Sequence, residues 1–146
     1  MNLEIERIVS PTDEAAEAVR RLLPQLSPAA AAPDAERLAT ILRSPSTALF
    51  AARIDREIVG MLTLVWYDIP TGRKAWVEDV VVDAAARGCG AGRALVAAAL
   101  DHAARIGAAK VLLTSRAERR AARALYRRMG FEAAETEVFA LKTDKK

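Results

Sequence analysis

The chain has 146 residues, of which 52% are hydrophobic and 28% charged, a balance typical of one globular domain. Its net charge of +3 suits an anionic ligand, but the basic residues form no run interleaved with aromatic side chains, which argues against nucleic-acid binding. A single cysteine, Cys89, excludes a disulfide framework, and no apolar run approaches the ~20 residues of a membrane-spanning helix. The N-terminus does not read as a signal peptide, so we expect a cytoplasmic protein with one domain over residues 1–146.

The first part of the chain predicts one strand and two helices. Leu3–Val9 alternates apolar and charged residues, as a half-buried strand does. Ser10 as a cap and Pro11 at the first helical position predict a helix that ends at Pro24. A second helix opens at Pro33-Asp34 and stops at Ser44-Pro45.

The rest of the chain predicts strands and helices in turn. Asp55-Arg56 joins two strands without the usual glycine, which indicates a different turn or modest strain, and Asp68–Arg73 reads as a loop. The order of elements is typical of a three-layer α/β fold with a mixed sheet. The expected strands are Thr47–Ile54, Glu57–Tyr67, Lys74–Val82, Lys110–Thr114 and Thr136–Lys142, and the expected helices are Gly90–Ile106 and Arg119–Met129.

A glycine-rich stretch follows the strand that ends in Val80-Val81-Val82. Gly88, Gly90 and Gly92 stand at alternate positions directly before an alanine-rich helix. Glycines there leave backbone N–H groups open at a helix N-terminus, where the helix dipole favours negative charge. The stretch therefore predicts a phosphate-binding loop, and the alternative is a turn that only lets the helix pack close to the sheet.

The spacing of these glycines excludes two common phosphate loops. A Walker A loop needs Lys-Ser/Thr after its last glycine, whereas Arg93-Ala94 follows Gly92. A dinucleotide fingerprint needs G-x-G-x-x-G and a later acidic residue, and both are missing. The remaining pattern, Arg87-x-x-Gly90-x-Gly92, resembles the acetyl-coenzyme A signature, Q/R-x-x-G-x-G/A, of the GNAT N-acetyltransferase superfamily.

A second motif of this superfamily, A-x-x-L-Y-x-x-x-G-F, resembles residues 122–131, which contain Tyr126 and Phe131. Many relatives carry asparagine seven positions before this tyrosine, where this chain has Arg119, so the resemblance does not extend to that one side-chain contact with the cofactor. The resemblance covers roughly residues 47–141. It implies a GNAT-like fold with a mostly antiparallel sheet, helices on both faces, and the first two helices forming one wall of the acceptor site.

The resemblance also implies how acetyl-coenzyme A is held. The backbone N–H groups of the loop bind the pyrophosphate, and the strand pairs with the pantetheine arm through Val80 and Val82. A backbone N–H at the end of this strand is the expected oxyanion donor. The alternative for the valines is plain core packing. The cofactor-binding residues expected on this basis are Val80, Val81, Val82, Arg87, Gly88, Cys89, Gly90, Ala91, Gly92 and Arg93.

Two residues are expected to be catalytic. Tyr126 matches the family's general acid toward the leaving thiolate, and Glu78 matches its base or a residue that holds a basic water. The alternatives are a tyrosine that only packs, and carboxylates Glu78 and Asp79 that form salt bridges on their strand. Because successive strand residues face opposite sides, at most one of these carboxylates is expected in the cleft. Cys89 and His102 are expected to take no catalytic part, and no metal is expected.

The implied function is N-acetyl transfer from acetyl-coenzyme A to a primary amine by direct attack in a ternary complex. The competing hypothesis is a module that binds acyl-coenzyme A without turnover. The acceptor, a small-molecule or peptide amine, is expected to bind in an anionic pocket with an aromatic edge. The expected walls of this pocket are Glu78, Asp79, Asp68 and the aromatic residues Trp66, Tyr67 and Trp76. No nucleic-acid or membrane partner is expected, and a homodimer is left open.

Overall fold

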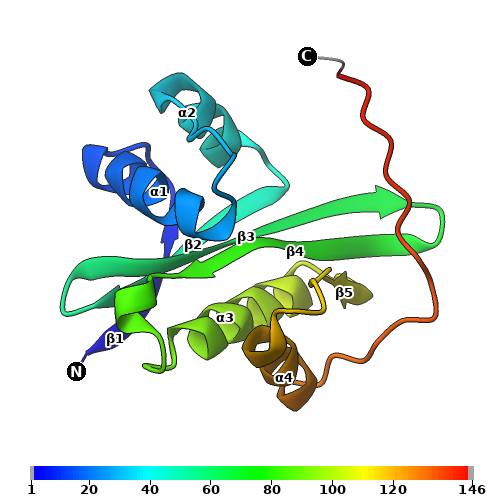
Figure 1. Ribbon diagram of the computed structural model, residues 1–146. Helices are drawn as coiled ribbons and strands as arrows, with labels where there is room; N and C mark the ends of the chain where they lie inside the picture. Colours follow the sequence, from blue (N-terminus) through cyan, green and yellow to red (C-terminus); the bar gives the residue numbers. More distant parts are fainter. Residues whose placement is uncertain (1, 145–146) are drawn as a thin grey trace. The chain divides into compact units, whose positions relative to one another are not determined.

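The computed structural model describes residues 2–144, which form two compact units divided between Leu113 and Thr114. The first unit begins and ends with a strand and contains five strands, three α-helices and one short 3-10 helix (Figure 1). Its elements are β1 (Leu3–Ile8), α1 (Asp13–Leu26), α2 (Ala35–Arg43), β2 (Thr47–Ile54), β3 (Glu57–Ile69), β4 (Gly72–Val82), η1 (Ala84–Ala86), α3 (Ala91–Arg105) and β5 (Lys110–Leu112). The second unit contains α4 (Arg120–Arg128).

The five strands form one mixed sheet in the order β1-β2-β3-β4-β5. The first three pairings are antiparallel, and β4 pairs with β5 in parallel, with Lys74 opposite Lys110. The expected mostly antiparallel sheet is thus confirmed. Asp55 and Arg56 in the β2–β3 turn both have positive φ (49° and 77°), so this turn reverses the chain without glycine, as its sequence indicated.

Helices cover both faces of this sheet, as expected. α1 and α2 lie on one face and α3 lies on the other (Figure 1). On the α1 side, Leu22, Leu38 and Met61 pack in one buried cluster. On the opposite side, α3 packs close to β3: a Cβ added at Gly60 of β3 would lie 3.2 Å from the Cδ1 atom of Leu95 of α3. Each fully buried leucine contributes about 1.5–3 kcal/mol to this packing.

The start and end of α1 differ from the expectation. Thr12 is the N-cap, with its side chain accepting a hydrogen bond from the N–H of Ala15 at 3.1 Å, so Ser10 and Pro11 precede the helix. Pro24 lies inside the last turn instead of ending the helix, and α1 continues to Leu26. Pro24 is exposed, so its ring lies on the solvent side of the helix.

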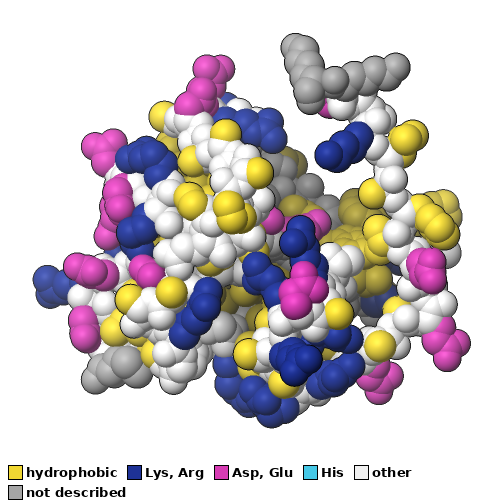
Figure 2. Space-filling view, viewed as in Figure 1, with side chains coloured by type: hydrophobic (Ala, Val, Ile, Leu, Met, Phe, Trp, Pro, Cys, Tyr) yellow, Lys and Arg dark blue, Asp and Glu magenta, His cyan; other side chains and the backbone are white. Residues whose placement is uncertain are grey.

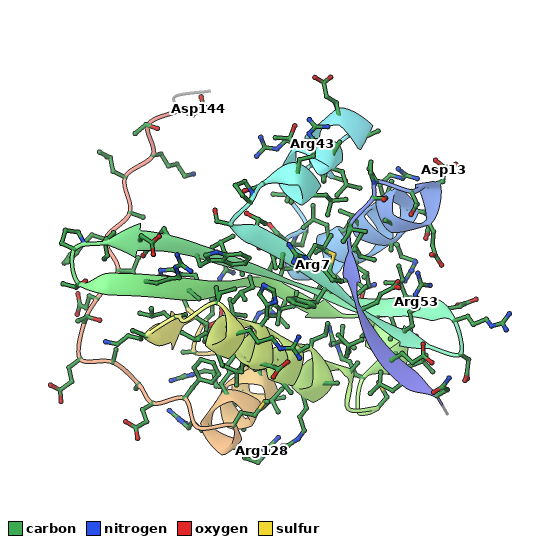
Figure 3. The ribbon with its side chains drawn as sticks, turned by 180° about the vertical axis from the view of Figure 1, so that it is seen from behind. Arg7, Asp13, Arg43, Arg53, Arg128 and Asp144 are labelled. Atoms are coloured by element: carbon green, nitrogen blue, oxygen red, sulfur yellow. The ribbon has the colours of Figure 1, made fainter. Side chains whose placement is uncertain are left out.

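Arg53 on β2 ties β1 and α1 together. Its guanidinium donates to Glu6 at 2.6 Å and to both carboxylate oxygens of Glu14 at 2.6 and 2.8 Å, and Figure 3 shows it beside the N-terminal strand. The hydrogen bond from Arg53 lowers the pKa of Glu14. This bidentate contact holds the start of α1 against the edge of the sheet.

The boundaries of the later strands also differ. β3 ends at Ile69 and β4 begins at Gly72, so the expected loop is instead a tight turn between them. The Arg73 guanidinium closes this turn by donating two hydrogen bonds, of 2.7 and 3.0 Å, to the Asp68 carboxylate. β5 ends at Leu112, two residues earlier than expected.

In the second unit, α4 is a short helix followed by an extended segment. Arginine side chains gather over α4 (Figure 2). Met129 caps the helix and Gly130 follows with φ +102°, a position that favours glycine. The expected strand Thr136–Lys142 is wrong: this segment forms no strand. Alternation alone supplies no hydrogen-bonding partner.

Candidate active site

A β-bulge in β4 lies at the expected catalytic carboxylates. Thr63 pairs with Glu78 and Met61 with Val81, so two steps along β3 match three steps along β4. Asp79, inside the bulge, has φ +49°, a conformation that non-glycine residues rarely adopt. The extra residue resets the alternation of side chains along the strand.

This bulge places Glu78 and Asp79 on the same face, which corrects the expectation that they face opposite sides. Glu78 shares the face of its cross-strand partner Thr63, and both Thr63 and Asp79 line a cavity under α1 and α2. Burial, and then the negative charge of Asp79, raise the pKa of Glu78. A carboxyl group with a raised pKa suits proton transfer from an amine.

The cavity has a volume of about 440 Å³ and lies between these two helices and the sheet. Most of its wall is apolar, and its polar side chains come from four positions. The apolar wall includes Val19, Leu23, Leu38, Ile41, Leu49 and Met61, and the polar residues are Asp34, Arg37, Thr63 and Asp79. The first two helices therefore do form one wall of a cavity beside the carboxylates.

The expected aromatic group does not line this cavity. Trp66 packs against His102 of α3 with ring centroids 5.2 Å apart, and Trp76 donates its Nε1–H to the Tyr67 hydroxyl at 2.9 Å. Asp68 is held by Arg73 at the β3–β4 turn, and this hydrogen bond lowers its pKa. Of the residues expected in the acceptor pocket, Asp79 lines the cavity and Glu78 shares its face.

Within the first unit, one edge of β4 is open next to the bulge. Among the described residues, the pairing with β5 extends only to Trp76, opposite Leu112. Asp83 donates its N–H to Val59 on β3 at 2.7 Å, and peptide groups of successive residues point to opposite edges of a strand. The peptide groups of Val82 and Val80 therefore point to the open edge, where an extended ligand can pair with them, whereas the Val81 side chain is buried in the core.

The glycine loop leads from this edge into α3. Gly88 and Gly90 have φ of +85° and +89°, and Gly90 is the N-cap of α3 without a side-chain hydrogen bond. A Cβ at either position would meet no atom within 4 Å, so these glycines are needed for backbone conformation and not for packing within the protein. The first N–H groups of α3, at Ala91, Gly92 and Arg93, have no carbonyl partner within the helix.

A side-chain cluster that the sequence did not reveal anchors the start of this loop. The Asp83 carboxylate accepts hydrogen bonds from Arg21 at 3.0 Å, Gln25 at 3.4 Å and the N–H of Ala85 at 3.2 Å. Gln25 in turn accepts from the N–H of Ala84 at 2.9 Å. The pKa of Asp83 is lowered, and the main cause is the hydrogen bond from the N–H of Ala85. No local pattern signals this cluster, because α1 and the loop are far apart in the sequence.

Tyr126 belongs to the second unit. It lies on α4 and packs edge-to-face against Phe131, with ring centroids 6.0 Å apart. Burial raises the pKa of Tyr126, and the charge of Arg119 opposes this effect. The hydroxyl therefore keeps its proton at neutral pH, as a general acid must.

Cys89 and His102 lie outside the carboxylate cavity. Cys89 is half-buried between two loop glycines, and with Arg87 it lines a second cavity of about 660 Å³ beside the β2–β3 turn. His102 packs between Phe50 and Trp66, and burial lowers its pKa. Over residues 2–144, no three His, Cys, Asp or Glu side chains gather as a metal site, and no helix is long and apolar enough to cross a membrane.

Comparisons with known proteins agree with the fold and the motifs. A family model described as the acetyltransferase (GNAT) family matches residues 13–131, so the chain belongs to the GNAT acetyltransferase family. No curated protein sequence matches it.

Three solved structures illustrate the similarity. An aminoglycoside acetyltransferase from an uncultured soil metagenomic sample, in complex with trehalose, is 25% identical, with a TM-score of 0.84 over 98% of this chain and 97% of that one. An acetyltransferase from Trypanosoma brucei is 26% identical, with a TM-score of 0.78 over 97% and 100%. AAC(6')-Iy, in complex with a coenzyme A bisubstrate analog, is 22% identical and shares the fold, with a TM-score of 0.80 over 99% and 100%.

Proposed function

We propose that this protein transfers the acetyl group of acetyl-coenzyme A to a primary amine by direct attack within a ternary complex. The observation that carries the proposal is the open edge of β4 between the carboxylate bulge and the glycine loop. A thioester bound along Val80 and Val82 would lie beside Asp79, and its pyrophosphate would reach the N–H groups between Arg87 and Arg93.

Each proposed residue has one chemical task. Acetyl-coenzyme A supplies the thioester carbonyl, and the backbone N–H at the strand end is the proposed donor to its oxygen. Glu78 accepts the proton of the amine, directly or through water, because a protonated amine has no lone pair for attack. Tyr126 donates a proton to the thiolate sulfur. This last role is supported by its motif and its raised pKa.

Ligand binding and turnover test the proposal separately. Acetyl-coenzyme A is expected to raise the Tm by mass action, and NAD and ATP far less. Release of free thiol with a panel of amines tests turnover, and intersecting initial-rate lines indicate a ternary complex. Equal thermal shifts from the three ligands would contradict the cofactor assignment. Binding without thiol release from any amine would instead support the acyl-coenzyme A-binding module.

A further inference from the structure

The cavity under α1 and α2 has an apolar wall and one acidic end. Leu23 of α1 and Ile41 of α2 are half-buried, and Leu38, Leu49 and Met61 lie deeper, each at most 6% exposed. Such a wall favours hydrocarbon, because polar groups pressed against it would lose their hydrogen bonds to water.

The charged residues of this cavity divide into two groups. Asp34 caps α2 by accepting a hydrogen bond from the N–H of Arg37 at 2.8 Å, and both residues line the cavity. The charges of these two residues offset each other. Asp79 lies in the β4 bulge at the sheet side of the cavity, with Glu78 adjacent on the same face. The uncompensated negative charge is therefore concentrated at one place, next to the open edge of β4.

We infer that the acceptor is a compact monoamine with an apolar body, such as an alkylamine or arylalkylamine. This inference rests on the proposed function. The amine nitrogen lies at Asp79 and Glu78, and the hydrocarbon lies against Leu23, Ile41 and Met61. An aminoglycoside carries several ammonium and hydroxyl groups, which this wall would leave without partners.

A homologous series of amines tests the inference directly. From propylamine to hexylamine, kcat/KM is expected to rise about 4-fold per methylene until the cavity is full. Phenethylamine is expected to exceed ethanolamine, an aminoglycoside and an alanine-initiated peptide. Higher kcat/KM for the aminoglycoside or the peptide would overturn the inference while leaving acetyl transfer intact. If no amine is acetylated although acetyl-coenzyme A binds, both the inference and the proposed function fail.

Two variants locate the effect in this cavity. Ile41→Thr removes apolar wall at a half-buried position and is expected to reduce the gain per methylene to below 2-fold. Arg37→Glu adds a second negative charge to the cavity, away from Asp79, and is expected to raise kcat/KM for diamines relative to monoamines by about 10-fold. Both variants are expected to keep the thermal shift with acetyl-coenzyme A, which shows that they fold. An unchanged chain-length dependence in Ile41→Thr would place the acceptor elsewhere.

Discussion

Arg21 of α1 donates a hydrogen bond from Nη1 to Oδ2 of Asp83 at 3.0 Å, although 62 residues separate the two in the chain. The same guanidinium donates from Nη2 to the carbonyl of Ile58 at 2.9 Å. Asp83 is the residue at which β4 passes into the glycine loop, so this contact connects α1 to the loop proposed to hold the pyrophosphate. The loop's position thus depends on a helix that contributes no residue to it.

Arg21→Met is therefore expected to raise KM for acetyl-coenzyme A about 2- to 5-fold, the range of an exposed ion pair, with kcat nearly unchanged. Arg20→Met, at an exposed neighbouring position, is the control. If Arg21→Met instead lowers kcat and leaves KM for acetyl-coenzyme A unchanged, Arg21 does not act by positioning the glycine loop.

The bulge makes the pKa of Glu78 depend on Asp79. Asp79→Asn removes one of the two causes that raise this pKa, so the pH–rate limb that reports base deprotonation is expected to move to lower pH. Glu78→Gln is expected to depress kcat/KM and to flatten this limb. The measurement is kcat/KM against pH, with Asp68→Asn as a carboxylate control outside the cavity. An unaltered limb in Glu78→Gln would reject Glu78 as the base.

Gly90 and Gly107 provide a matched pair at the two ends of α3. Both have positive φ, +89° and +75°, with open space where a Cβ would lie. Substitution by alanine is expected to cost roughly 1–2 kcal/mol of unfolding free energy at either site, because an L side chain disfavours this conformation. Only Gly90→Ala is expected to weaken acetyl-coenzyme A binding, measured by titration calorimetry. Equal affinity of the two variants would assign Gly90 to local backbone shape alone.

Tyr126→Phe removes only the hydroxyl. It is expected to lower kcat about 10²–10⁴-fold while the affinity for acetyl-coenzyme A is kept, since a general acid acts in the chemical step. Tyr67→Phe is the control, because the Tyr67 hydroxyl accepts from Trp76 on the β3–β4 hairpin. Unaffected turnover in Tyr126→Phe would mean that water or another group protonates the thiolate.

His102 gives the stability a pH dependence of defined sign. Burial, and then the charges of Arg7 and Arg105, lower its pKa below 6.5, so the unfolded chain binds the proton more tightly. The stability contribution is present above pH 6.5 and is lost as the pH falls through 6.5 toward the lowered pKa. Urea unfolding at a series of pH values on both sides of this range measures the slope, which His102→Gln is expected to reduce. The same slope in both proteins would assign it to other groups.

Much of the fold could be predicted because its signals are local. The strands Thr47–Ile54 and Glu57–Tyr67 contain apolar β-forming runs, and Asp34 and Gly130 mark helix ends by their own backbone preferences. The glycine loop could be recognised for the same reason, since positive φ and a strand–loop–helix order depend on neighbouring residues. The side-chain directions of Glu78 and Asp79 could not be predicted. One inserted residue at the bulge reverses the alternation of side chains on which that prediction rested.

Tertiary structure decided the features that join distant residues. The sequence determined that the loop precedes a helix and that two carboxylates stand before it. Only the fold placed both carboxylates on the α1 face, ended β5 at Leu112 so that one edge of β4 stays open within the first unit, and formed no strand over Thr136–Lys142. Hydrogen-bond partners and cavity walls come from residues far apart in the chain, so no local pattern encodes them.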